Sequence, residues 1–431
     1  MASTGRTFVL TIMAAAVMLL LTISGSSAPQ RVYDQEWTSF RGNPHNQASS
    51  PRELLILEPE WEFHADGAIT TSVVAAEGLG IFATSEGTVY CVVVQNGSMR
   101  WNASVGSPVY STPSIDIDNE AVYICDRSGK VTSLDMKTGD VRWQWDTGSG
   151  QDIESSPLVA DKIYFGSYDS YLYALNKNGT LAWRFEGCMG WIHTSPAFLE
   201  GMVYFGSCDG QMRALDAGTG EEIWNFSAAY IPSSPSIFDG KVFFGAYDSN
   251  MYCLDALTGA LVWNTTMGNN VYSSPAVDGE YVVVGCNDGL LYCLDIDDGE
   301  IIWSLDLGPG PLESSPLISG TKAAVNYDQG LVVVHLTNGT VSQRFLLGDG
   351  ANTSPSVYDD LLFWGDAHGY VYCLKGKGSG TKDNDDDGSF DLNDELDLGR
   401  DTIFFLIALV MVISTVVFIF FRKYKRMRKQ E

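Results

Sequence analysis

A segment of about forty residues recurs along the chain, and most copies end in a nearly identical phrase. The phrase reads LDAGTGEEIW at residues 215–224, LDALTGALVW at 254–263 and LDIDDGEIIW at 294–303. Ahead of the phrase each copy carries a Ser/Thr-Pro pair, with prolines at 113, 157, 196, 235, 275, 316 and 355; Val73 holds this position in the first copy. Eight copies of this period predict an all-β, eight-bladed propeller with four strands in each blade.

One copy shows where the strands lie. SPSIFDG, KVFFGAYD, SNMYCLDA and ALVWNT follow one another over residues 234–265, rich in β-formers and separated by turn residues. LTG is a hairpin turn in which Gly259 can adopt a positive φ. A single blade cannot bury both faces of its sheet, so the blades must stack.

The ends of the repeat region fit a closed ring. The eighth copy, at 354–378, stops after three strands, and a spare fourth strand, EWEFHADG, lies at 60–67 with Trp61 in the repeated Trp position. We expect this N-terminal strand to complete the last blade, which removes an exposed sheet edge. The seventh copy is the most divergent, with Gln343 near the Trp position.

Both termini carry membrane signals. Residues 1–28 have Arg6, an apolar run and then small residues, the order of a signal peptide, with an uncleaved anchor as the alternative. Residues 402–421 contain no charge and are long enough for one transmembrane helix. The tail at 422–431 holds six Lys/Arg, so it should face the cytoplasm. The prediction is a single-pass type I protein of the cell membrane, with the propeller on the extracytoplasmic side.

The net charge limits the classes of partner that the protein can bind. The chain has 26 Lys/Arg against 53 Asp/Glu, a net charge of −27. Such a surface repels nucleic acid, which is excluded as a partner.

Several motifs together resemble the pyrroloquinoline-quinone-like (PQQ-like) propeller repeat family. They are the Ser-Pro opening, the turn GSCDG at 206–210, the L-D-x-x-T-G-x-x-x-W closing and a W-x-x-F-R-G lead-in beginning at Trp37. The resemblance covers about residues 37–375. We expect a lead-in at 29–60, a propeller at 61–376 and an acidic linker at 377–401. The family contains quinone-dependent dehydrogenases and cofactor-free propellers, among them those of outer-membrane assembly, which this chain resembles more.

No catalytic constellation is evident in the sequence. The five histidines form no zinc motif, and no nucleophile elbow, Walker A or haem-attachment motif stands in a suitable context. The resemblance implies adjacent cysteines and large insertions in the dehydrogenases, and this chain has no Cys-Cys pair. We therefore expect no enzyme activity and no bound PQQ; a PQQ-dependent dehydrogenase-like quinoprotein remains the alternative.

Two sets of repeated residues are predicted to be structural. The tryptophans that end each copy, such as Trp224 and Trp263, should pack between neighbouring blades. Cys91, Cys253, Cys293 and Cys373 stand where other copies have alanine and should be small buried residues. Cys188, between blades, and Cys208, in a turn, should share a face, which allows either a disulfide or two free thiols.

That loop face is the predicted binding surface. Its turns carry Asp126, Asp169, Asp209, Asp248, Asp288, Asp328 and Asp366, which we expect to bond their own backbone. Trp191, His193 and Tyr230 break the repeat and are the candidate contacts for a protein or glycan partner. Asn102, Asn225 and Asn264 lie in Asn-x-Ser/Thr sequons on outer strands and are candidate glycosylation sites.

The linker holds a possible calcium loop. Asp383, Asp385, Asp387, Ser389, Asp391 and Asp394 occupy the ligand positions of D-x-D-x-D-G-x5-[D/E], with Gly388 at the turn. Position 12 is Asp instead of Glu, and flanking helices are not evident, so a solvated acidic spacer is the alternative. The sequence as a whole predicts a membrane-anchored, non-catalytic binding or assembly scaffold. A receptor-type sensor is a second alternative, although the ten-residue tail carries no effector domain.

Overall fold

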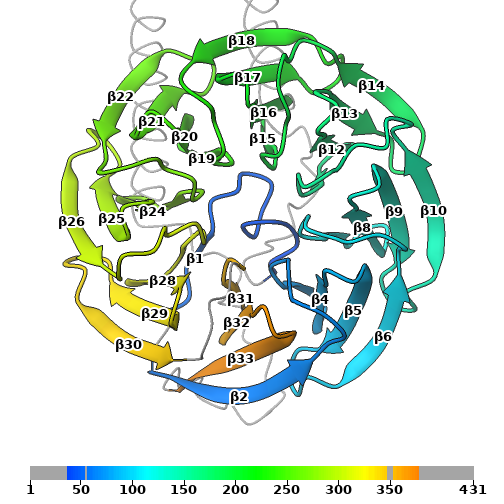
Figure 1. The fold of residues 1–431 in the computed structure, drawn as a ribbon, viewed down its shortest axis with the longest axis horizontal. Helices are drawn as coiled ribbons and strands as arrows, with labels where there is room; N and C mark the ends of the chain where they lie inside the picture. Colours follow the sequence, from blue (N-terminus) through cyan, green and yellow to red (C-terminus); the bar gives the residue numbers. More distant parts are fainter. Residues whose placement is uncertain (1–35, 54–55, 347–352, 378–431) are drawn as a thin grey trace, which may run out of the picture. The chain divides into compact units, whose positions relative to one another are not determined.

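The computed structural model describes residues 36–53, 56–346 and 353–377. Eight β-sheets stand around a central channel, and consecutive sheets follow the chain around the ring (Figure 1). All the regular structure within the described residues is β-strand. The predicted eight-bladed propeller is confirmed.

Each blade is a meander of antiparallel strands that runs from the channel outward. Blades 1 to 4 comprise β3 (Val74–Ala76), β4 (Leu79–Ala83), β5 (Thr88–Val93), β6 (Met99–Ser104); β7 (Ser114–Asp116), β8 (Ala121–Cys125), β9 (Lys130–Asp135), β10 (Val141–Asp146); β11 (Leu158–Val159), β12 (Ile163–Gly166), β13 (Leu172–Leu175), β14 (Leu181–Phe185); β15 (Ala197–Leu199), β16 (Met202–Gly206), β17 (Gln211–Asp216), β18 (Glu222–Ser227). Blades 5 to 8 comprise β19 (Ser236–Phe238), β20 (Lys241–Gly245), β21 (Asn250–Asp255), β22 (Leu261–Thr266); β23 (Ala276–Val277), β24 (Tyr281–Gly285), β25 (Leu290–Asp295), β26 (Ile301–Asp306); β27 (Leu317–Ser319), β28 (Lys322–Tyr327), β29 (Gly330–His335), β30 (Val341–Leu346); β31 (Ser356–Tyr358), β32 (Leu361–Gly365), β33 (Tyr370–Lys377), β2 (Ile56–His64).

Burial decreases from the second strand of a blade to the fourth. In blade 4, every residue of β16 is buried, the middle four residues of β17 are buried, and β18 buries one residue in six. The second strands read as continuous apolar runs because a neighbouring blade covers each of their faces. The outer strands alternate because one edge and part of a face meet solvent.

The last blade is closed by the N-terminal strand, as predicted. β2 pairs antiparallel with β33, and Trp61 stands opposite Cys373. The strand begins at Ile56, ahead of the predicted boundary, and it leaves no free edge between the ends of the ring.

The repeated Trp and the repeated Gly meet across each blade interface. The indole of Trp224 lies against Gly259 of the next blade, where a Cβ would come within 2.7 Å of the ring, and its Nε1 donates to the Ala256 carbonyl. The same pairing joins Trp61 to Gly97, Trp101 to Gly139, Trp143 to Gly179, Trp183 to Gly220, Trp263 to Gly299 and Trp303 to Gly339. The prediction that the tryptophans pack between blades is confirmed. At the interface of blades 7 and 8, Gln343 takes the Trp register and bonds the backbone of Leu57 instead.

The Ser/Thr before each proline forms a ring around the channel. Its hydroxyl accepts the backbone N–H of the equivalent residue in the preceding blade, as in Ser156 N–H to Ser195 Oγ at 3.0 Å. The ring runs through Ser72, Thr112, Ser156, Ser195, Ser234, Ser274, Ser315 and Ser354, and Ser72 Oγ completes it by donating to the Ser354 carbonyl. These bonds satisfy backbone donors that would otherwise face the channel unpaired.

The lead-in crosses the channel at the end formed by the innermost strands (Figure 1). Its carbonyls accept the N–H groups that these strands turn toward the axis, in five blades: Thr38 from Ile115, Pro44 from Phe198, His45 from Ile237, Gln47 from Val277, and Ala48 from Ile318. Trp37 exchanges two such bonds with Ala75 of blade 1, and β1 (Ser49–Ser50) adds a parallel strand to blade 7. One short segment therefore ties most of the ring together.

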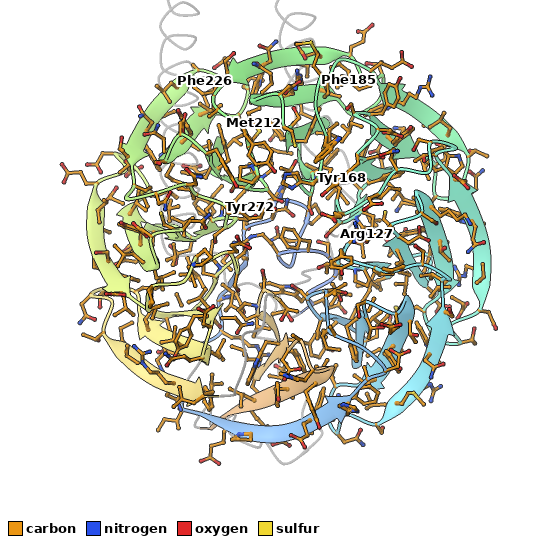
Figure 2. The ribbon with its side chains drawn as sticks, in the orientation of Figure 1. Arg127, Tyr168, Phe185, Met212, Phe226 and Tyr272 are labelled. Carbon is orange, nitrogen blue, oxygen red and sulfur yellow. The ribbon has the colours of Figure 1, made fainter. Side chains whose placement is uncertain are left out.

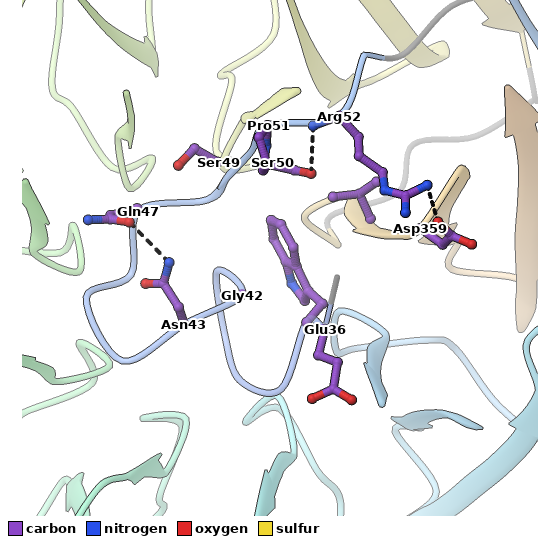
Figure 3. Close-up of a pocket in the computed structure, with 11 residues that line it drawn as sticks. Glu36, Gly42, Asn43, Gln47, Ser49, Ser50, Pro51, Arg52 and Asp359 are labelled. Atoms are coloured by element: carbon purple, nitrogen blue, oxygen red, sulfur yellow. Dashed lines mark hydrogen bonds and ion pairs between the residues drawn. The ribbon is translucent and has the colours of Figure 1, made fainter. Parts of the chain in front are cut away.

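The W-x-x-F-R-G spacing has a local cause. Gly42 has a φ of +89° and lies against the Trp37 indole, where a Cβ would come within 2.9 Å of the ring. Arg41 is buried, its Nε donates to the Asn46 carbonyl at 3.2 Å, and burial lowers its pKa to about 9. Beyond this turn the lead-in passes Gln47 and reaches Arg52, which pairs with Asp359 of blade 8 (Figure 3).

Candidate functional site

The loops between blades and the turns between second and third strands share one face of the propeller. The turn residue Cys208 donates its N–H to the Trp191 carbonyl of the inter-blade loop at 2.9 Å, and Tyr247 donates to the Tyr230 carbonyl in the same way. These bonds hold the loops against the turns, so the side chains of both are presented on a rigid frame.

Most turn carboxylates on this face are used to build the turns. Asp248 accepts the Asn250 N–H at 3.1 Å through Oδ1 and the Tyr252 hydroxyl at 2.7 Å through Oδ2. The same double contact is made by Asp169, Asp288 and Asp366 with Tyr173, Tyr292 and Tyr372. The expectation that these aspartates bond their own backbone is confirmed, and it removes most of the acidic rim as a binding feature.

Aromatic side chains gather at the channel mouth over blades 3 to 6. We call this group the mouth cluster; its members are Tyr168, Trp191, His193, Tyr230, Tyr247 and Tyr272. Trp191 stacks flat on Tyr168, with ring centroids 5.0 Å apart and planes 1° from parallel. His193 Nε2 lies 2.6 Å from the Tyr230 hydroxyl and its ring stacks on Tyr272. Tyr168 and Tyr272 flank the opening of the ring in Figure 2. The structure thus brings together all three predicted contact residues.

Burial favours the uncharged forms of three titratable groups in the cluster, His193, Tyr272 and Tyr168. Burial lowers the pKa of His193 to about 4, so its imidazole is uncharged. Burial, with Glu313 and Glu154 nearby, raises the pKa of Tyr272 to about 12. Burial and the hydrogen bond that Tyr168 donates to Glu154 likewise raise the pKa of Tyr168.

Beneath the cluster, the channel encloses a cavity of about 230 Å³. The hydroxyl ring surrounds it, Glu154, His193, Tyr272 and Glu313 line its mouth, and Phe40 of the lead-in lies on the opposite side. Arg127 stands near this mouth, bonded to Asp152 at 2.6 Å and placed over the Tyr110 ring. The cavity can hold a small polar group between hydroxyls and carboxylates.

Blade 4 departs from its neighbours at Arg213. This residue occupies the register that Tyr173, Tyr252 and Tyr292 hold in other blades. Its guanidinium, 7% exposed, bonds both oxygens of Asp209, and Asp209 also accepts the Met189 N–H at 3.0 Å. The pair fixes the loop that carries Met189 and Trp191. Burial alone would raise the pKa of Asp209, but the bonds from Arg213, Ser207 and Met189 outweigh it and hold that pKa below its usual value.

The cysteines at this face have separate neighbours. Cys188 lies beside Ser207 and Arg213, and Cys208 lies beside Tyr230. Both thiols are free in the structure, and burial raises the pKa of Cys188 to about 12 and that of Cys208 to about 11. The Cys188–Cys208 disulfide stays a prediction. The cysteines at the alanine register, Cys91, Cys253, Cys293 and Cys373, are buried as expected.

The structure describes the predicted glycosylation sites but not the predicted calcium loop or membrane segments. Asn102, Asn225 and Asn264 are exposed on β6, β18 and β22. The calcium-loop residues, from Asp383 to Asp394, lie outside the described residues, as do the signal peptide and the span at 402–421. Within residues 36–53, 56–346 and 353–377, no helix could cross a membrane and no three His, Cys, Asp or Glu side chains are placed to share a metal ion.

Sequence reasoning missed Tyr168, Tyr247 and Arg213. Tyr168 and Tyr247 each precede a turn aspartate, at a position that varies from copy to copy, so neither of them carries a signal in the sequence. Arg213 did carry one, because it replaces a tyrosine that recurs at the same register in other copies.

Comparison with known proteins agrees with this architecture. Residues 115–375 match the family described as "Beta-alanine-activating enzyme, beta-propeller". The outer membrane protein assembly factor BamB of Salmonella typhimurium is 28% identical over 115 residues, which cover 24% of this chain and only 28% of that relative. The PQQ-like propeller repeat suggested by the sequence is confirmed.

Solved structures share the fold at low identity. BamB of Moraxella catarrhalis has a TM-score of 0.66 at 20% identity, covering 74% of this chain and all of that one. A quinohemoprotein alcohol dehydrogenase of Comamonas testosteroni has a TM-score of 0.70 at 14% identity, covering 80% of this chain and 81% of that one. Because BamB and an alcohol dehydrogenase both carry this fold, function has to be argued from the site.

Proposed function

We propose that this chain, which belongs to the beta-alanine-activating enzyme beta-propeller family, is a non-catalytic binding or assembly scaffold that captures its partner at the mouth cluster. The family match covers a propeller, and a propeller supplies a rigid frame on which loops present contacts. The partner is a protein or a glycan that inserts its contacts around Trp191.

The observation that carries this proposal is the state of Trp191. Its side chain is 55% exposed, yet it is held flat on Tyr168, and Met189 beside it is 92% exposed. An exposed aromatic residue whose orientation is already fixed loses little entropy when it is buried by a partner. Tryptophan is also the residue type most often found to dominate binding energy at interfaces.

The location predicted from the sequence supports the same role. A signal peptide at 1–28, a membrane span at 402–421 and a basic cytoplasmic tail at 422–431 would together put the propeller outside the cytoplasm on one membrane anchor. The likeness to an outer membrane protein assembly factor supports an assembly role at a cell envelope. The aromatic mouth, with Glu154 and Glu313 beside it, suits a protein or glycan, and the net charge of −27 disfavours nucleic acid.

A matched pair of substitutions tests the proposal. The full chain is recovered from its native membranes with its partners, as wild type, Trp191→Ala and Leu257→Ala. Leu257 is 68% exposed in the turn between β21 and β22, on the opposite face. Trp191→Ala should reduce retained partner at least tenfold, since truncation of such an anchor costs about 2 kcal/mol or more, and Leu257→Ala should leave it unchanged. Equal retention by all three proteins would refute the proposal.

Two observations favour the dehydrogenase alternative. The channel holds a cavity, and a quinohemoprotein alcohol dehydrogenase has the same fold. PQQ and calcium are added to the purified full chain, and dye-linked oxidation of alcohols and sugars is followed. Turnover that depends on both additions would show that the protein is an enzyme and would refute the scaffold proposal. We expect none.

A further inference from the structure

A second pocket lies away from the mouth, on the outer side of the interface between blades 7 and 8. It encloses about 540 Å³. Its walls come from β2, β30, β32 and β33, and its lining includes Trp61, Phe345, Leu346, Trp364, Tyr372 and Leu374. This volume and the mainly apolar lining are those of a ligand pocket. We call it the seam pocket.

Blade 7, which forms one side of this interface, departs from the repeat at two positions, one of which is next to the pocket-lining residues of β30. Gln343 replaces the repeated Trp on β30, and Ala324 stands on β28 at the register where Tyr204 of blade 4 packs against its own Trp224. Phe345 still reaches across to Trp364, with ring centroids 6.4 Å apart. Trp364, which is 2% exposed and stacks on Tyr372, forms a rigid floor.

The rim of the seam pocket has one exposed apolar side chain and two acidic side chains. Leu346 is 68% exposed at the end of β30. Glu60 and Glu62 are exposed on β2 and line the opposite wall. The cation on the lining, Arg344, is engaged by Tyr327, whose ring lies 5.5 Å below its guanidinium and whose hydroxyl accepts a bond at 3.1 Å.

The negative charges of Glu60 and Glu62 limit which polypeptide segment can bind in the seam pocket. The chain's own acidic linker carries Phe390 and Leu392 among Asp391, Asp394 and Glu395, so its apolar residues would bring carboxylates against Glu60 and Glu62. A second copy of a chain with net charge −27 is disfavoured for the same reason. A basic segment gains attraction from both glutamates.

We propose that the seam pocket binds an aromatic or long aliphatic side chain of a partner polypeptide whose flanking residues are lysine or arginine. The apolar side chain lies on Tyr372 and Phe345, above the buried Trp364, and the flanking cations lie against Glu60 and Glu62. This binding is independent of the mouth cluster.

The first test replaces Leu346 with photoreactive p-benzoylphenylalanine in the full chain and irradiates native membranes. Leu346 is exposed, so the replacement should be tolerated. The expected adduct joins another polypeptide at an apolar residue flanked by Lys or Arg. Reversal of charge in Glu60→Lys/Glu62→Lys should lower its yield about tenfold, because two attractions become repulsions. The control Glu221→Lys/Glu280→Lys reverses two exposed carboxylates on other blades and should leave the yield unchanged.

An adduct confined to this chain, to a second copy or to lipid would overturn the proposal. So would the absence of any adduct, or an adduct whose yield ignores the charge of residues 60 and 62.

The second test titrates the purified full chain with labelled peptides that contain Lys-Phe-Lys, Glu-Phe-Glu or Lys-Ser-Lys and follows fluorescence anisotropy. The Lys-Phe-Lys peptide should bind about tenfold more tightly than either of the others, since it alone supplies both the apolar and the cationic contact. Trp191→Ala should leave this binding unchanged, which separates it from the proposed function. Equal binding of the three peptides would contradict the assignment.

Discussion

The side-chain amide of Gln343 bonds both backbone groups of Leu57, accepting the Leu57 N–H at 2.8 Å and donating to the Leu57 carbonyl at 3.1 Å. Leu57 precedes Trp61 by four residues, the same spacing that separates the repeated Gly from the repeated Trp, as in Gly259 and Trp263. Blade 8 therefore offers a buried leucine where the other blades offer a glycine. Gln343, which replaces the repeated Trp on blade 7, therefore bonds Leu57, which replaces the repeated Gly on blade 8.

Restoring the repeated tryptophan should therefore destabilise the protein. We expect Gln343→Trp to cost about 1–3 kcal/mol of unfolding free energy, because the indole would meet the Leu57 side chain. Leu57→Gly is also destabilising, since it removes a buried side chain. The two changes together should cost less than their sum by about 0.5–3 kcal/mol. Chemical unfolding of the four proteins measures this coupling, and strict additivity would contradict the seam geometry.

A pair of glycines separates backbone strain from tryptophan packing. Gly259 and Gly240 have φ of +70° and +69°, but a Cβ at 259 would lie 2.7 Å from the Trp224 ring, and one at 240 would meet nothing within 4 Å. Gly240→Ala should cost about 1–2 kcal/mol from backbone strain alone. Gly259→Ala should cost about 1–3 kcal/mol more, from overpacking. Thermal unfolding compares them, and equal midpoints would show that the Trp contact is unimportant.

Arg213 should be replaceable by tyrosine but not by leucine. Arg213→Leu leaves Asp209 buried without its cation, at a cost of about 3–5 kcal/mol. Arg213→Tyr restores the Tyr–Asp bond of blades 5 and 6, for which Tyr252 and Asp248 provide the geometry, and should cost markedly less. Because the pKa of Asp209 is depressed in the folded state, the wild-type contribution is present at neutral pH and is lost as pH falls through that value. Melting temperatures of both variants at neutral and acid pH provide the measurement.

His193 should make the protein less stable as the pH falls below 6.5. The pKa of His193 is about 4 in the folded state against an ordinary 6.5. Between these two pH values the imidazole binds a proton in the unfolded chain but not in the folded protein. Stability should decrease from pH 6.5 toward 4, by about 1–2 kcal/mol at pH 5, and His193→Gln should remove this component. Unfolding titrations across this range would show the same slope in both proteins if His193 were charged in the fold.

Removing the N-terminal strand tests ring closure. Deletion of residues 29–67 takes away β2, β1 and the lead-in, which leaves β33 with a bare edge and the innermost strands with unpaired N–H groups. The melting temperature should drop sharply, as measured by loss of β-sheet circular dichroism. An unchanged melting temperature would show that the ring is held without the strand.

The repeat made the fold predictable, and the deviations from it held most of the site. Spacing, strand pattern and the spare strand with Trp61 were enough to predict eight blades and their closure, because each copy reports the same packing. The Trp224–Gly259 contact joins two copies of the repeat, so its two halves were visible but their pairing was not. The Trp191–Tyr168 stack could not be predicted because it depends on the relative rotation of neighbouring blades.

The strand that closes the ring, β2, is synthesised before every other blade strand and is paired last. β33, the partner of β2, emerges from the ribosome roughly 300 residues later, a delay of about 15–60 s at ordinary translation rates. Throughout that interval the nascent blades form an open arc, with the edge of β2 unpaired although the lead-in has already been synthesised. Closure of the ring therefore has to wait until β33 has emerged, and until then the open edge of β2 has to be kept from pairing with other chains.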